Sequence, residues 1–398
     1  MNRHLAKTVR NLRPSGIRRY FDIVDSLDDV VTLGIGEPDF VTPAHILEAG
    51  MHSLRAGKTG YTSNAGTTEL RAAIATHIER RYGLRYAADD EVLVTVGVSE
   101  ALFLALKTLL DAGDEVLVVE PCFVANPALV EMTGGAPVPV PTSAEDDFQV
   151  TGAALEAHIT PRSKAILLSY PSNPTGAVLT REHLLQVAEV ARKHDLVVIS
   201  DEIYERLVYG SQHINFATLP GMRERTIVLS GMSKSYAMTG WRIGYVTAPR
   251  AYTQAMYKLH QYLIMAAPTM GQAAALQAIR HGENDIEAMR RRYGQRRRLL
   301  VDGFNGLGLR CFEPRGAFYA FPSIASTGMD DETFCETLLK DERLALIPGR
   351  AFGTSGAGYV RASYATSEAN ILEALTRLER FLAARGIIER QGAPALVA

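Results

Sequence analysis

The sequence predicts an α/β fold in which a mostly parallel sheet is covered by helices on both faces. Between about residue 65 and residue 250, short runs that are apolar at nearly every position alternate with stretches of helical periodicity. Strands without polar alternation are typical of a sheet buried on both faces, and the helices between them provide the crossovers that parallel strands need. We therefore expect a three-layer α/β/α domain, and the length of 398 residues leaves room for a smaller α+β domain.

The individual elements follow from the same patterns. Strands are expected at 91–96, 114–119, 165–169, 196–200, 226–230 and 241–246, with two shorter ones near the C-terminus at 316–321 and 359–363. Helices are expected at 69–82 and 99–110, and a long helix at 286–304. Arginines 290–292 and 296–298 are expected to mark the solvent-exposed face of this long helix. The tail 390–398 has no periodicity, and we expect it to be frayed.

Composition favours a small-molecule partner. The net charge is −2, with 42 basic and 44 acidic residues interspersed, so no field builds up that would attract nucleic acid or an anionic membrane. Cys122, Cys311 and Cys335 are scattered and lack metal-ligand spacing, which argues against a disulfide framework and a metal site. No apolar leader follows Met1 and no segment is apolar for long enough to span a bilayer, so we expect a cytoplasmic protein.

The chemically most informative segment is 230–244. It carries Lys234 among small residues, and Arg242 follows eight positions later. Such an amine can bond covalently to an aldehyde cofactor, and such an arginine can pair with the phosphate of that cofactor. Pyridoxal phosphate has both groups. Alone, the two residues would usually be solvated surface cations.

Further polar residues gather at one edge of the expected sheet. Asn173 follows one strand, Asp201 and Tyr204 follow the next, and Lys234 follows a third. Ligands of open α/β sheets bind beyond the carboxyl ends of the strands. In isolation, Asn173 would be a turn residue and Asp201 a helix N-cap. Their shared position instead predicts a site at this edge.

Taken together, these segments resemble the class I/II aminotransferases of the fold type I pyridoxal-phosphate enzymes. The resemblance covers almost the whole chain and rests on Leu33–Phe40, Tyr170–Gly176, Asp201–Tyr204, Ser230–Gly244 and Tyr359–Ala365. It implies an aminotransferase that moves an amino group from an L-amino acid to a 2-oxo acid such as 2-oxoglutarate by a ping-pong mechanism. It also implies three parts: an N-terminal segment 1–45 that joins the small domain, a large cofactor-binding domain 46–285 and a C-terminal small domain 286–398.

The resemblance assigns the reacting groups. Lys234 would carry pyridoxal phosphate as an aldimine and later act as general base, a role that a lowered lysine pKa would favour. Asp201 would pair with the pyridine nitrogen, so that the protonated ring withdraws electrons from the substrate Cα. Asn173 and Tyr204 would hydrogen-bond the phenolic oxygen of the cofactor. Phe123 would lie over the cofactor ring, although a core phenylalanine is an equally good interpretation.

The phosphate and the second subunit complete the expected site. Val98, Ser99 and Glu100 open a helix whose N-terminus suits an anion, and Ser233 and Arg242 would add contacts. Many members of the family carry a serine three residues before the lysine, where this chain has Gly231, so the hydroxyl donor stays open. Tyr61 resembles the tyrosine that reaches the phosphate of the neighbouring subunit, which implies a homodimer.

The residues expected to bind the substrate leave the identity of the amino acid open. Arg361 resembles the arginine that binds the substrate α-carboxylate through its planar fork, with Asn173 and Gly36 beside it. The chain looks most like the broad-specificity branch that acts on aromatic amino acids, aspartate and glutamate. No arginine occurs in 261–268, where dicarboxylate-specific relatives place one, and this favours aromatic substrates. An aspartate-specific enzyme could use another cation, Lys107 or His260.

Three other interpretations compete with an aminotransferase. A lyase or synthase on the same scaffold could use the same lysine and aspartate. A non-catalytic cofactor sensor fused to a DNA-binding module would need an extra helix-turn-helix segment, for which the chain has no room. A nicotinamide-dependent dehydrogenase is disfavoured because no complete dinucleotide-binding glycine motif is present.

Overall fold

A seven-stranded sheet forms the centre of the structure, a computed structural model that describes residues 4–12, 14, 16–17 and 27–389. Its strands are β2 (Val92–Thr95), β3 (Glu115–Glu120), β4 (Ala136–Pro141), β5 (Ser163–Ser169), β6 (Val197–Asp201), β7 (Thr226–Gly231) and β8 (Gly244–Thr247). They lie in the order β2-β8-β7-β6-β5-β3-β4, and all neighbours are parallel except β8, which is antiparallel to β7 and β2. The predicted α/β class with a mostly parallel sheet is confirmed.

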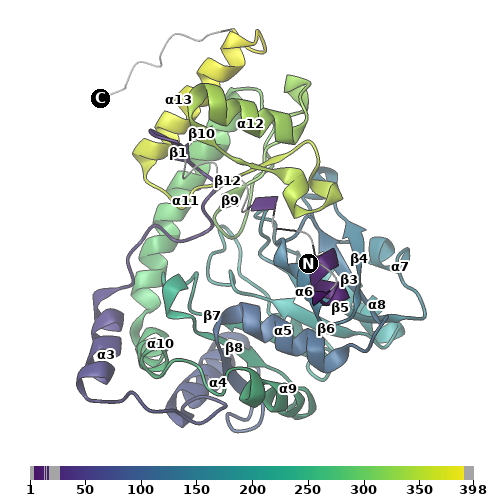
Figure 1. Ribbon diagram of the computed structural model, residues 1–398, viewed down its shortest axis with the longest axis vertical. Coiled ribbons are helices and arrows are strands. Elements are labelled where there is room, and N and C mark those ends of the chain that lie inside the picture. The colour runs from purple at the N-terminus through teal and green to yellow at the C-terminus, as the bar shows by residue number, and fades with distance from the viewer. Residues whose placement is uncertain (1–3, 13, 15, 18–26, 390–398) are drawn as a thin grey trace.

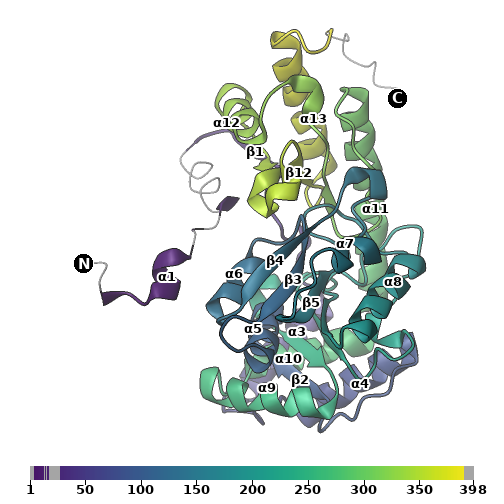
Figure 2. The ribbon, with the colours of Figure 1, turned by 90° about the vertical axis from the view of Figure 1, so that its right-hand side faces the viewer.

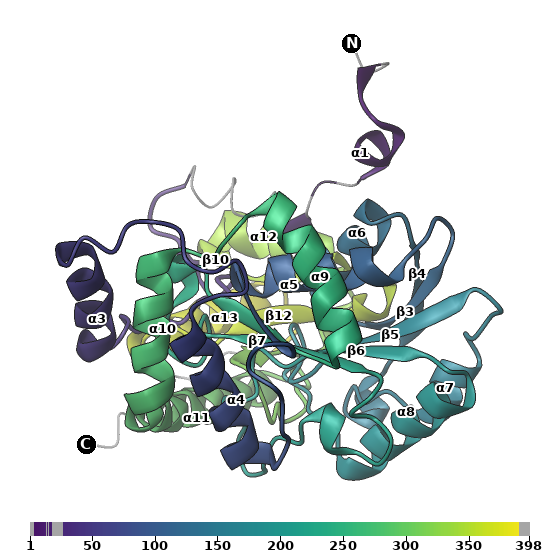
Figure 3. The same cartoon turned by 90° about the horizontal axis from the view of Figure 1, so that it is seen from below.

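Helices cover both faces of this sheet (Figure 3). They are α4 (Thr68–Tyr82), α5 (Gly97–Leu109), α6 (Ala125–Met132), α7 (Gly152–Glu156), α8 (Arg181–Lys193), α9 (Arg250–Leu263) and α10 (Thr269–His281), and α3 (Ala44–Arg55) packs on the outside of α10. Alternate strand residues point to opposite faces. On β3, Val116 and Val118 pack with α5 and α9, whereas Leu117 and Val119 join the core that contains α8. The sheet is therefore buried on both sides, as its apolar strands predict.

Two features of the sheet differ from what the sequence predicts. The strand expected at 241–246 begins only at Gly244, because Trp241 ends a short 3-10 helix and Arg242 has a φ of 55°. Strand β4 was not predicted at all. Its alternating prolines cannot donate to a ladder, but β4 lies at the edge of the sheet and pairs only with β3, where prolines are tolerated.

The C-terminal part lies at one end of the sheet and is joined to it by the long helix α11 (Glu283–Gly306) (Figures 1 and 2). It contains α12 (Asp331–Glu342), α13 (Glu368–Ala384), β9 (Tyr319–Ala320), β10 (Leu344–Ala345), β11 (Ile347–Pro348) and β12 (Val360–Ser363). Strand β1 (Val31–Thr32) pairs in parallel with β10, so the N-terminal segment lies against this part. A further short helix, α1 (Lys7–Asn11), precedes it and projects from the body (Figure 2). The expected tail 390–398 is outside the described residues.

The expectation for the arginines of α11 is wrong in part. Arg296 and Arg297 are buried, and Arg296 Nη1 lies 2.9 Å from both carboxylate oxygens of Asp39. Arg297 donates to Glu313 and to the carbonyl of Pro314. The two side chains reach back to segments far away in the sequence, which a pattern of local periodicity cannot reveal.

Among the described residues, none of the helices combines the length and the apolar composition that a membrane span requires.

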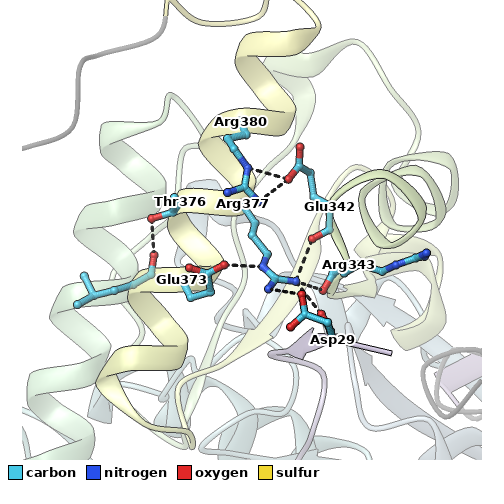
Figure 4. Close-up of polar contacts among 8 residues, drawn as sticks. Asp29, Glu342, Arg343, Glu373, Thr376, Arg377 and Arg380 are labelled. Carbon is cyan, nitrogen blue, oxygen red and sulfur yellow. Dashed lines mark hydrogen bonds and ion pairs between the residues drawn. The ribbon is translucent and has the colours of Figure 1, made fainter. Parts of the chain in front are cut away.

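A buried arginine, Arg377, connects α13 with the end of α12 and with the segment that precedes β1 (Figure 4). Arg377 on α13 donates through Nη1 to the carbonyls of Asp29, Glu342 and Arg343 at 2.8, 3.2 and 3.2 Å. Its Nη2 meets the Asp29 carboxylate at 3.1 Å, and its Nε meets Glu373 at 2.7 Å. The guanidinium thus satisfies carbonyls at the end of α12 and holds the chain that enters β1.

Replacing Arg377 with glutamine should destabilise the fold, because the carbonyls of Asp29 and Glu342 lose their donor, whereas that of Arg343 still accepts the N–H of Val31. An unsatisfied buried polar group costs about 1–3 kcal/mol. The matched control is Arg380→Gln on the same helix, which breaks a more exposed contact with Glu342 worth at most about 1 kcal/mol. Urea unfolding of both variants measures the difference. Equal free energies of unfolding for the two would contradict this role for Arg377.

Candidate active site

A cavity of about 540 Å³ lies beyond the carboxyl ends of β5, β6 and β7. It is bounded by the start of α5 on one side and by residues of the C-terminal part on the other. The structure brings nearly all the sequence-predicted site residues to its lining: Gly36, Val98, Ser99, Phe123, Asn173, Asp201, Tyr204, Ser233, Lys234, Arg242 and Arg361. Glu100 and Tyr61 do not line it.

Lys234 enters the cavity from the loop that follows β7. Its Nζ donates to the carbonyl oxygen of Gly36 at 2.8 Å. Burial lowers the pKa of Lys234 to about 8, and Arg361 and Arg242 act in the same direction, whereas Glu37 opposes the shift. A larger share of this amine is therefore neutral near pH 7 than of an ordinary lysine, and the neutral form is the nucleophile.

Asp201 is the last residue of β6, and its carboxylate accepts the N–H of Ile203 at 3.1 Å. A turn, not a helix, follows it, so the N-cap interpretation does not hold. Burial raises the pKa of Asp201 to about 7. The carboxylate thus lies in a site that disfavours a lone negative charge and would gain from a positively charged partner.

Arg361 comes from β12 and is only 2% exposed. Its Nη1 donates to Asn173 Oδ1 at 2.9 Å and its Nη2 to the carbonyl of Gly34 at 2.6 Å, while Nε has no partner among the described residues. The rings of Tyr319 and Phe352 lie 4.6 and 4.9 Å from the guanidinium carbon. A fixed, buried guanidinium beside the cavity is suited to a carboxylate.

The other end of the cavity suits an anion. Gly97 begins α5 with a φ of 71°, and a Cβ there would come within 2.4 Å of Arg242 Nη2. The guanidinium therefore lies directly over the helix N-terminus, whose N–H groups and dipole attract negative charge. Arg242 donates to the carbonyl of Thr239 at 3.0 Å and has no carboxylate partner among the described residues. The charge is free for a ligand.

The missing serine at position 231 has a structural reason. A Cβ on Gly231 would lie 2.8 Å from the carbonyl oxygen of Ile243, so no serine fits without a shift of the backbone. Of the nearby hydroxyls, those of Ser99 and Ser233 belong to residues that line the cavity, whereas Ser230 does not line it. Ser99 and Ser233 can therefore offer hydroxyl donors at this end of the cavity.

Two predicted residues lie elsewhere. The Glu100 carboxylate accepts the N–H of Val96 at 2.5 Å and contacts His260 Nδ1 at 2.6 Å. This side chain therefore connects the start of α5 to α9 and does not face the cavity. Tyr61 is 86% exposed and stands outside the cavity of its own chain. Neither Lys107 nor His260 lines the cavity, which removes both as cations for a substrate side chain within this chain.

Sequence reasoning missed several lining residues. Tyr319 is buried on β9, and its hydroxyl lies 2.9 Å from the hydroxyl of Tyr204. Asn126 donates to Ser169 Oγ at 3.0 Å, and Ser169 is the neighbour of Asp201 in the sheet register. The strand that carries Tyr319 was predicted, but only its pairing with β12 shows that this tyrosine faces the site.

Comparisons with known proteins identify the family of this chain. The profile of the family described as "Aminotransferase class I and II" matches residues 28–378. YugH of Bacillus subtilis (strain 168), named as an aminotransferase without a substrate, is 49% identical over 96% of this chain and 99% of its own. The aspartate aminotransferase of Pyrococcus abyssi is 42% identical over 93% of this chain and 96% of its own.

A solved structure gives the same result. The aromatic aminotransferase from Pyrococcus horikoshii OT3 matches with a TM-score of 0.89 and 42% identity, covering 93% of this chain and 100% of that one. Fold and sequence therefore match known aminotransferases over almost the full length of the chain. The chain belongs to the class I and II aminotransferase family and is itself a transaminase.

Proposed function

We propose that this aminotransferase uses pyridoxal phosphate and prefers aromatic L-amino acids as amino donors. The cofactor assignment rests on one observation. Lys234 and Asp201 line the same cavity, and Arg242, which has no carboxylate partner among the described residues, lies over the start of α5. These groups fit the cofactor: an amine for its aldehyde, a buried carboxylate for its ring nitrogen, and a cation at a helix N-terminus for its phosphate. Ser99 and Ser233 add hydroxyl donors there.

When bound, pyridoxal phosphate supplies an aldehyde that takes up the amino group and a ring that withdraws electrons from the substrate Cα. The protein groups do the rest. Asp201 holds a proton at the ring nitrogen, and the guanidinium of Arg361 binds and orients the substrate carboxylate. Lys234 Nζ, with its lowered pKa, removes the proton from the substrate Cα and can return one. Donor and acceptor would occupy the same cavity in turn, as a ping-pong mechanism requires.

The lining supports an aromatic donor. Within the described residues, the cations that line the cavity are Lys234, Arg242 and Arg361, and each has a proposed role that a donor side chain does not share. The remaining wall includes apolar side chains: Ile17, Leu102, Phe123 and Leu129. Apolar surface stabilises an aromatic ring by burial, whereas a second carboxylate would need a partner.

We further propose a cytoplasmic homodimer whose Tyr61 reaches the phosphate of the other subunit. Tyr61 is exposed, and Tyr262, at 89% exposure, begins a run of exposed apolar residues that extends to Met265. The amide of Asn64 donates to the Met265 carbonyl, so the two segments form one surface. Large exposed apolar patches mark interaction sites. The division into 1–45, 46–285 and 286–398 is part of the same proposal.

A panel of amino donors with 2-oxoglutarate tests the substrate class. We expect kcat/KM for phenylalanine and tyrosine to exceed that for aspartate by at least about tenfold, a difference of about 1.4 kcal/mol in transition-state binding. Arg361→Lys serves as the control and should lower kcat/KM for both classes by similar factors, since every donor has an α-carboxylate. A wild-type preference for aspartate would refute the aromatic assignment.

Asp201→Asn should stabilise the cofactor-free protein while abolishing most transaminase activity. The pKa of Asp201 is about 7 in the folded protein and 3.8 as the ordinary value of the unfolded chain. As the pH rises from 3.8 to 7, Asp201 ionises in the unfolded chain but stays protonated in the folded one, so the wild type loses stability over this range. Asparagine removes that loss, which amounts to at most about 4 kcal/mol at pH 8. Removing the charge opposite the ring nitrogen should cost about 3–5 kcal/mol of activation free energy.

Thermal unfolding of the cofactor-free proteins at pH 5 and pH 8, combined with activity assays, measures both effects. The control is Asp195→Asn, because Asp195 is an exposed partner of Arg225 and lies far from the strand end. Its stability and activity should stay within a few tenths of a kcal/mol of wild type. An Asp201→Asn protein that is less stable than wild type at pH 8, or fully active, would contradict the role of Asp201.

A further inference from the structure

A second cavity, of about 260 Å³, lies on the opposite face of the sheet from the active site. Strand residues alternate between the two cavities: Ser169 and Asp201 line the first, whereas their neighbours Leu168 and Ser200 line the second. Leu168 and Ser200 are partners in the sheet register, as are Ser169 and Asp201. Strands β5 and β6 are thus a shared wall, one residue thick, between two pockets.

The lining of the second cavity contains a buried contact between Glu202 and His213. Glu202 is 2% exposed and accepts hydrogen bonds from Ser200 Oγ at 2.9 Å and from the N–H of Phe216 at 3.0 Å. Its other carboxylate oxygen meets His213 Nε2 at 2.6 Å. Burial opposes protonation of His213, but Glu202 raises its pKa above the ordinary value. Nδ1 of His213 has no protein partner in the described part of the chain and remains available.

The rim adds positive charge without a counter-charge. Arg181, the first residue of α8, and Arg315 both line the cavity and are exposed. Neither has a carboxylate partner among the residues that the structure describes. The N-terminus of α8, capped by Thr180, opens onto the same cavity and contributes the positive end of its dipole. Two arginines and His213 therefore line a cavity together with Glu202, whose carboxylate already contacts Ser200, Phe216 and His213.

Ser211 and Gln212 also line the cavity, but much of the remaining wall is apolar: Leu168, Val178, Leu179, Leu184, Val208 and Phe216. A cavity with apolar walls and a few convergent cations matches a compact organic anion, because the body can be buried while the charge is paired. Inorganic anions would leave the apolar walls without contacts. A dianion of sugar-phosphate type would place hydroxyls against them, which costs desolvation.

We propose that this cavity is a second binding site, separate from the active site, for a small carboxylate with an apolar body. The carboxylate would lie between Arg181, Arg315 and His213, and the apolar part would contact Leu168 and Leu184. The site is one residue away from the reaction centre along β6, because Ser200, Asp201 and Glu202 are consecutive. An occupant is thereby placed to influence the electrostatics of Asp201 from behind the sheet.

The proposal is tested by titrating the holoenzyme with phenylacetate and measuring the heat of binding by isothermal titration calorimetry. Phenylacetate could also enter the active site through Arg361, so the titration is done in the wild type and in Arg361→Lys. We expect a binding event that persists in Arg361→Lys and is weakened at least tenfold in the double variant Arg181→Ala/Arg315→Ala. The double variant should keep wild-type transaminase activity, since neither arginine lies in the active site.

The matched control is Arg298→Ala, which removes an exposed arginine of α11 outside the cavity and should leave the persistent event unchanged. The proposal is overturned if Arg361→Lys abolishes all binding. It is also overturned if the double arginine variant binds phenylacetate as tightly as the wild type, or if Arg298→Ala weakens binding equally. If the second binding site is refuted in this way, the transaminase assignment still stands, because it is measured by turnover of amino donors and not by this titration.

Discussion

The structure depends on the burial of two ionisable side chains at the carboxyl ends of adjacent strands. Asp201 ends β6, and Lys234 follows β7, so the sheet brings a carboxyl group and an amine into one enclosed space. Loss of water raises the pKa of the first to about 7 and lowers that of the second to about 8. Both groups can therefore exchange protons near neutral pH, which neither could do at a solvent-exposed position.

The N-terminal segment is held in place by three buried arginines from separate elements. Arg377 of α13 binds Asp29, Arg361 of β12 binds the carbonyl of Gly34, and Arg296 of α11 binds Asp39. This segment supplies the Gly36 carbonyl that accepts from Lys234 and places Glu37 in the cavity lining. One of the three arginines, Arg361, is also the proposed substrate-carboxylate binder. Substrate binding and the position of the N-terminal segment are thereby connected through a single guanidinium.

The parts of the site that follow strand ends could be predicted from the sequence. Asn173, Asp201 and Lys234 each come directly after an apolar run, and the carboxyl ends of parallel strands meet at one edge. Contacts between distant segments could not be predicted in this way. The pairing of β9 with β12 places Tyr319 against Tyr204 and Arg361, and nothing local to residue 319 indicates it. The same limit explains the wrong expectation for Arg296, whose partner Asp39 is far away in the chain.

We propose that the cofactor is carried by Lys234. Reducing the purified enzyme with borohydride and mapping the modified peptide by mass spectrometry tests it most directly, since reduction makes the lysine–cofactor bond permanent. We expect one phosphopyridoxyl group per chain, on the peptide that contains Lys234, and loss of absorbance from the native cofactor. A label on another lysine, or a purified protein that binds no pyridoxal phosphate, would contradict it.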